Sequence, residues 1–83
     1  MQPAAPVTLT ADQSEELSKQ LSNMRHDINN HLSLMMAAVE LIRRKPEAAE
    51  RMAPTLTEQP AKIAVSMKKF SAEFEAALGI KRE

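Results

Sequence analysis

Apolar side chains recur along residues 10–44 with gaps that alternate between four and three positions. Such spacing repeats every seven residues and keeps these side chains on one stripe of an α-helix. In a heptad lettered a to g, Leu21 and Ile28 occupy a positions, and Leu17 and Met24 occupy d positions. The pattern therefore predicts one long amphipathic helix. The complete a and d set is Leu17, Leu21, Met24, Ile28, His31, Met35, Ala38 and Ile42.

The apolar stripe widens in the second half of this helix. Leu32 and Val39 fall at e positions, and Leu34 and Leu41 fall at g positions, on either side of the seam. A two-stranded coiled coil needs only a and d, whereas a helix in a four-helix bundle buries a broader face. The stripe therefore favours a bundle.

Local signals set the ends of the first helix. Thr10 and Gln13 have the spacing of a capping box, so a helix should begin there. The residue before a proline is biased away from helical conformation, so this helix should end near Arg44. We therefore predict a helix over residues 10–44 and a turn at residues 45–46.

A second helix is predicted over residues 46–78. Pro46 suits a first helical position, and Gly79, the only glycine, suits the position that follows a helix end. Pro54 and Pro60 each remove a helical hydrogen bond, at a cost of roughly 3 kcal/mol in a straight interior. A kink or local break is therefore expected near residues 54–60. Beyond it the seam resumes at Ile63, Met67, Phe70, Phe74 and then Ala77 or Leu78.

The short turn makes the two helices antiparallel neighbours, so the expected fold is an all-α helical hairpin over residues 10–79. Residues 1–9, with two prolines and no periodic pattern, are expected to be a mobile tail, and residues 80–83 a second tail. One hairpin of this size cannot cover two apolar stripes, and without cysteine it cannot form a stabilising disulfide. We therefore expect a homodimer that forms a four-helix bundle.

Charge and hydropathy exclude several classes of partner. Eleven basic and eleven acidic residues cancel, which argues against binding to nucleic acid or to an anionic membrane surface. The first residues lack the basic start and apolar run of a secretory signal, and no segment approaches the ~20 apolar residues that span a bilayer. We therefore expect a soluble, cytoplasmic protein.

The first of the two histidines falls on the side of the helix that faces away from the seam. His26 is at f, Asn30 lies one turn further on the same exposed stripe, and Asp27 follows His26 directly. A neutral imidazole can attack a phosphoryl group, an adjacent carboxylate can orient the ring, and an amide can hydrogen-bond a phosphoryl oxygen or a water. A plain solvated surface histidine is the alternative interpretation.

The second histidine, His31, falls at d inside the expected bundle. A polar residue at such a position is typically a core residue that helps to fix helix register. A metal site is the competing interpretation, but the two histidines are five residues apart, unlike the i, i+4 pair of a zinc helix. With no cysteine and a single glycine, we expect neither a metal nor another cofactor.

The stretch Arg25-His26-Asp27-Ile28-Asn29-Asn30-His31-Leu32 resembles the H-box of bacterial sensor histidine kinases. Residues 10–78 as a whole are similar to the dimerisation and histidine phosphotransfer domain of those kinases. The resemblance implies that His26 is the phosphoacceptor and that Asp27 assists phosphoryl transfer. It also implies that Asn30 positions water against a phosphoaspartate, as in family members with phosphatase activity.

Two features depart from the family pattern. His31 follows Asn30 where many members have a proline, and the 83 residues contain no ATP-binding domain, so we do not expect an autonomous kinase. The resemblance then implies a free-standing dimeric phosphotransfer-like protein of a two-component system. It would relay a phosphoryl group through His26 to or from a response-regulator receiver domain, with a sensor histidine kinase as the other expected partner. A non-catalytic or phosphatase-type docking module and a plain oligomerisation domain are the alternatives.

Overall fold

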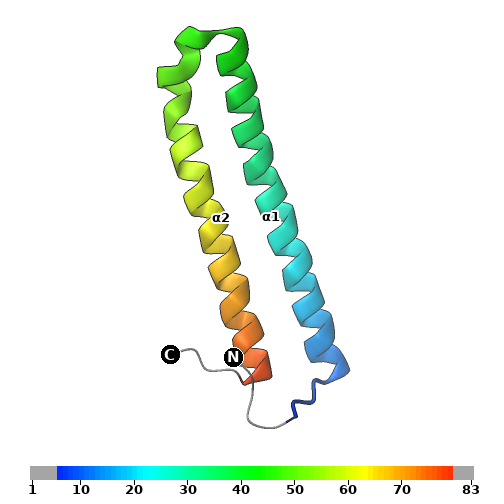
Figure 1. The fold of residues 1–83 in the computed structure, drawn as a ribbon. Coiled ribbons are helices and arrows are strands. Elements are labelled where there is room, and N and C mark those ends of the chain that lie inside the picture. Colours follow the sequence, from blue (N-terminus) through cyan, green and yellow to red (C-terminus); the bar gives the residue numbers. More distant parts are fainter. Residues whose placement is uncertain (1–5, 80–83) are drawn as a thin grey trace.

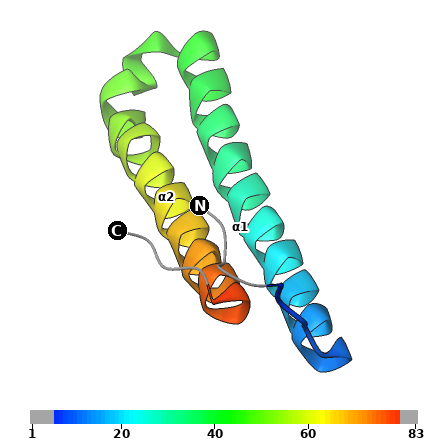
Figure 2. The ribbon, with the colours of Figure 1, turned by 60° about the horizontal axis from the view of Figure 1, so that its bottom comes forward.

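The computed structural model describes residues 6–79 and consists of two long helices joined by a tight turn (Figure 1). Helix α1 is Ala11–Arg44, the short 3-10 helix η1 is Pro46–Ala48, and α2 is Ala49–Leu78. The long helices run antiparallel and side by side in both views (Figures 1 and 2), so the prediction of an all-α hairpin is confirmed. The tail predicted at 80–83, and residues 1–5 of the tail predicted at 1–9, lie outside the described residues.

The start of α1 is fixed by the predicted capping box. The Gln13 amide nitrogen donates to Thr10 Oγ1 at 3.1 Å, and the Thr10 amide nitrogen donates to Gln13 Oε1 at 2.8 Å. These two bonds satisfy backbone donors that have no partner inside the helix. The capping-box prediction is therefore confirmed.

A Thr10→Ala change should lower the free energy of unfolding by about 1 kcal/mol, because it removes the oxygen that accepts from the Gln13 amide. Urea unfolding followed by circular dichroism measures the difference. Ser18→Ala is the matched control, because Ser18 is an exposed position within α1. A Thr10→Ala chain as stable as the Ser18→Ala chain would contradict this account of the helix start.

Small residues let the helices approach each other near the turn. The most buried apolar residues within 6–79 are Ala38 on α1 and Ala48 on η1, at 3% and 2% exposure. Pro46 opens η1, where its missing amide hydrogen costs nothing. At the other end of the hairpin, Gly79 closes α2 in a left-handed conformation, with φ 68° and ψ 24°. Glycine adopts this conformation without strain, as expected from its place after Leu78.

The two internal prolines do not break α2. The helix continues from Ala49 to Leu78 through Pro54 and Pro60, so the local break considered from the sequence is wrong. Between the prolines, the Thr57 hydroxyl donates to the Ala53 carbonyl at 2.9 Å, a contact that often accompanies a bend. The kink near residues 54–60 stays a prediction.

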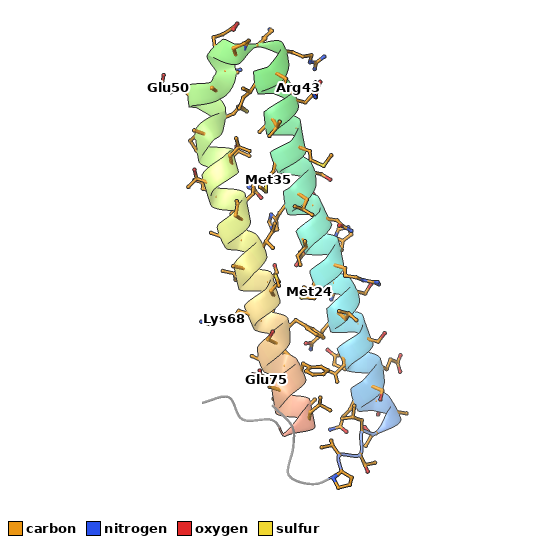
Figure 3. The ribbon with its side chains drawn as sticks, in the orientation of Figure 1. Met24, Met35, Arg43, Glu50, Lys68 and Glu75 are labelled. Carbon is orange, nitrogen blue, oxygen red and sulfur yellow. The ribbon has the colours of Figure 1, made fainter. Side chains whose placement is uncertain are left out.

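The hairpin is a single layer and has almost no core. Its principal extents are 57 × 28 × 12 Å, and its radius of gyration is 17.9 Å, against about 12 Å for a compact domain of this length. No large apolar side chain within residues 6–79 is fully buried. Met24 and Met35 project between the helices, whereas Lys68 points outward from α2 (Figure 3).

Apolar side chains collect on one side of this layer, here called the apolar face. Each residue of an α-helix is rotated by about 100° from the one before it. The e positions of α1 and Leu56 of α2 therefore point to the same side of the hairpin. A groove of about 390 Å³ there is lined mainly by apolar side chains of both helices, among them Leu32, Met35, Val39 and Leu56. By the same rotation, the apolar face comprises Leu21, Ile28, Leu32, Met35, Val39 and Ile42 of α1, and Leu56, Ile63, Met67, Phe74 and Leu78 of α2.

The opposite side of the layer, here called the polar face, is rich in charged and amide side chains. Those of α1 include Gln20, Asn23, Asp27 and Asn30, and those of α2 include Lys62 and Lys69. Two cavities on this face are each lined by residues of both helices, so those residues lie on the same side of the hairpin. Helical rotation places Leu34 and Val65 on this side as well, and both are exposed. Leu34, one of the g positions that widen the heptad stripe, therefore lies on the polar face, and its packing in a bundle stays a prediction.

Candidate functional site

The predicted site residues lie in the middle of α1, on the polar side of the hairpin. His26, Asp27 and Asn30 are all exposed, and so are Asn23 and Ser33 on the same stripe. Asn30 is four residues after His26, so its side chain lies one turn further along the same side of the helix. A docking partner can therefore reach the imidazole and the amide together.

Asp27 does not orient the His26 ring in the hairpin. Within residues 6–79, neither side chain takes part in a hydrogen bond or ion pair. Consecutive residues on a helix point about 100° apart, so adjacent side chains do not face each other. His26 therefore stands towards solvent, and Asp27 turns towards α2.

Asp27 instead lines a small cavity between the two helices. This cavity, of about 80 Å³, also contains Asn23, Ser66 and Lys69 among its lining residues. The lining of this cavity on the polar face therefore includes a carboxylate, an amide, a hydroxyl and an ammonium group. The carboxylate belongs to Asp27, the residue that follows His26. The ammonium and amide groups can donate to the oxygens of a phosphoryl group.

His31 is fixed across the hairpin by a hydrogen bond to the second helix. His31 Nδ1 lies 2.6 Å from Gln59 Oε1, and Gln59 is 7% exposed. An amide oxygen only accepts, so His31 Nδ1 donates and Nε2 is left unprotonated in the neutral ring. His31 is half-buried at the seam, and its polar contact links α1 to α2 within one chain.

Gln59 is the site residue that the sequence interpretation missed. The seam of the second helix had been traced only from Ile63 onward, because Pro60 interrupted the pattern. Four residues before Ile63 the same spacing reaches Gln59, which the structure places against His31. Continuing the seam through the proline would have identified it.

The described residues offer no cluster for a metal ion. Within 6–79, no three side chains of histidine, aspartate or glutamate gather closely enough to hold one. In the same part of the chain, no helix combines the length and the apolarity that crossing a bilayer requires.

Comparisons with protein-family models, with curated proteins and with solved structures find no match to this chain. The residues of the H-box-like stretch and their geometry are therefore the features that point to a function.

Proposed function

We propose that the chain is a cytoplasmic, homodimeric histidine phosphotransfer-like protein of a two-component signalling system. His26 accepts a phosphoryl group from a receiver domain or a sensor histidine kinase and passes it to a receiver aspartate. The observation that carries the proposal is the separation of two surfaces. His26, Asp27 and Asn30 are exposed on the polar side of α1, while most of the exposed large apolar side chains lie on the other side.

Surface area supports the dimer in this proposal. The chain exposes 6643 Å², whereas a compact monomer of 9.2 kDa exposes about 4900 Å². A standard interface removes roughly 800 Å² from each partner, which is less than this excess. Two apolar faces packed together form a four-helix bundle and leave both polar faces in solvent.

Phosphoryl transfer at His26 needs only groups that the polar face and a receiver supply. A neutral ring nitrogen of His26 attacks the phosphorus of the receiver's aspartyl phosphate. A nitrogen–phosphorus bond forms, the phosphorus–oxygen bond breaks, and the aspartate carboxylate leaves with the electron pair. Lys69 lines the cavity that Asp27 also lines, so it adds a positive charge to the polar face on which a receiver docks. The reverse reaction follows the same path.

The proposal predicts that phosphate moves between this chain and a receiver domain. Receiver domains from the same organism, phosphorylated with radiolabelled acetyl phosphate and freed of the donor, are mixed with the purified chain. Label should appear on the chain in an acid-labile, base-stable form, which is typical of phosphohistidine, while a matching receiver loses it. If no receiver transfers label and no sensor kinase phosphorylates the chain, the relay is wrong.

A docking module without phosphohistidine is the second candidate. The absence of a hydrogen bond to His26 or Asp27 within residues 6–79 favours it, because nothing in the hairpin holds the nucleophile in place. In its phosphatase form, Asn30 orients water against the receiver's phosphoaspartate.

Asn30→Ala and His26→Ala separate the phosphatase from the relay. For a phosphatase, Asn30→Ala should slow receiver dephosphorylation by at least about tenfold, because it removes a hydrogen bond to the attacking water. His26→Ala should leave dephosphorylation running and should leave pure docking nearly intact. Release of inorganic phosphate from a phosphorylated receiver measures dephosphorylation, and titration calorimetry with the receiver measures docking. Loss of dephosphorylation in the His26→Ala chain would exclude the phosphatase.

A further inference from the structure

A hydrogen bond across the hairpin holds the imidazole of His31 in one tautomer, whereas His26 in the predicted site has no such contact within residues 6–79. His31 Nδ1 donates to Gln59 Oε1 at 2.6 Å, which leaves Nε2 with a free lone pair. Gln59 is buried, so its amide oxygen has little competition from water. An imidazole whose second nitrogen is held by a hydrogen-bond acceptor has the arrangement of an oriented nucleophile.

The same ring borders a surface cavity whose lining is mainly apolar and includes one lysine and one serine. The cavity, of about 350 Å³, is lined by His31, Ala61, Lys62, Val65 and Ser66. The Lys62 ammonium and the Ser66 hydroxyl can both donate to phosphoryl oxygens. Within residues 6–79, neither of these side chains is engaged in another hydrogen bond or ion pair.

This cavity stays accessible when two copies associate through their apolar faces. Lys62 and Val65 lie on the polar face, and Val65 is 67% exposed. The groove that belongs to the apolar face is lined by a different set of residues, Leu32 and Leu56 among them. A ligand can therefore reach His31 from the polar side of a dimer.

We propose that His31 is a second phosphoryl-accepting residue, modified on Nε2 by a small phosphoryl donor of the acyl phosphate or phosphoramidate class. The Nε2 lone pair forms the new nitrogen–phosphorus bond, and the donor's bond from phosphorus to oxygen or nitrogen breaks. The carboxylate or ammonia leaves with the electron pair. The Nδ1 proton stays on the ring, where Gln59 Oε1 stabilises the positive charge that develops.

The test uses the full chain with His26→Gln, which removes an exposed imidazole and leaves the hairpin interior unchanged. Potassium phosphoramidate is the probe, so the result does not depend on any receiver domain or on the relay through His26. Mass spectrometry should locate one phosphoryl group on His31, and ³¹P NMR should identify the Nε2 isomer. An unlabelled chain, or label on Nδ1, overturns the proposal.

Two further variants test the contacts that the proposal uses. Adding Gln59→Leu should slow labelling of His31 about tenfold, as expected for a lost hydrogen bond to a charged group. Lys62→Ala should slow it about threefold, whereas Lys68→Ala, which removes a lysine that points outward, should not (Figure 3). Unchanged labelling with Gln59→Leu, or equal rates for the two lysine variants, contradicts the site.

Discussion

A chain that carries Met67→Lys should sediment as a monomer at concentrations at which the unchanged chain is a dimer. Met67 lies on the apolar face and is 51% exposed in the single hairpin. In the proposed bundle its side chain would be buried against the partner copy, and a lysine there would be a buried charge. One such charge costs about 4 kcal/mol, which alone corresponds to roughly a thousandfold rise in the Kd, and a symmetric dimer buries two, so the Kd should rise by at least that factor.

Val65→Lys is the matched control for this experiment. Val65 lies on the same helix and is 67% exposed, but it belongs to the polar face. The substitution places a lysine in solvent, so the dimer should persist. Analytical ultracentrifugation over a concentration series measures both variants, and circular dichroism follows any loss of helix on dissociation. A dimer that survives Met67→Lys but not Val65→Lys would show that association uses the polar face.

A chain that carries His26→Gln should accept no phosphate from a phosphorylated receiver, a loss of at least about a thousandfold in transfer rate, as is typical when a nucleophile is removed. Glutamine is of similar length and stays exposed, so α1 and the dimer should be unaffected. Its amide nitrogen carries no basic lone pair and cannot form the nitrogen–phosphorus bond. The measurement follows label on the receiver and on the chain together over time.

Ser33→Ala serves as the control for the His26 substitution. Ser33 lies on the same exposed stripe, seven residues further along α1, and makes no side-chain hydrogen bond within residues 6–79. Transfer should therefore proceed at the rate of the unchanged chain. Equal transfer by the His26→Gln and unchanged chains would remove His26 from the mechanism.

Much of the fold follows from local features of the sequence. Thr10 and Gln13 satisfy each other's backbone amides, and Gly79 accepts a left-handed conformation, so both outer ends could be predicted from neighbouring residues alone. The seven-residue repeat predicted a long first helix because each apolar side chain returns to the same stripe. These features depend on short-range geometry, which the sequence specifies directly.

The features that the sequence did not predict depend on how the two helices pack against each other. Pro60 interrupted the seam, so Gln59 was not recognised as a seam residue, and its pairing with His31 depends on how α2 lies against α1. Leu34 was assigned to the apolar stripe, although the side on which a g position lies depends on where α2 packs. The same packing turns Asp27 towards Lys69 and away from His26. The surroundings of each of these residues depend on the position of the second helix, which the local sequence pattern does not specify.

The phosphorylated residue can be located on the unchanged chain after exchange with a phosphorylated receiver domain. The sample is digested at neutral pH to preserve phosphohistidine, and the peptides are sequenced by mass spectrometry with electron-transfer fragmentation. Phosphate should be found on His26, on the exposed polar side of α1. A chain that remains free of phosphohistidine after contact with every receiver and sensor kinase of the organism would contradict the relay.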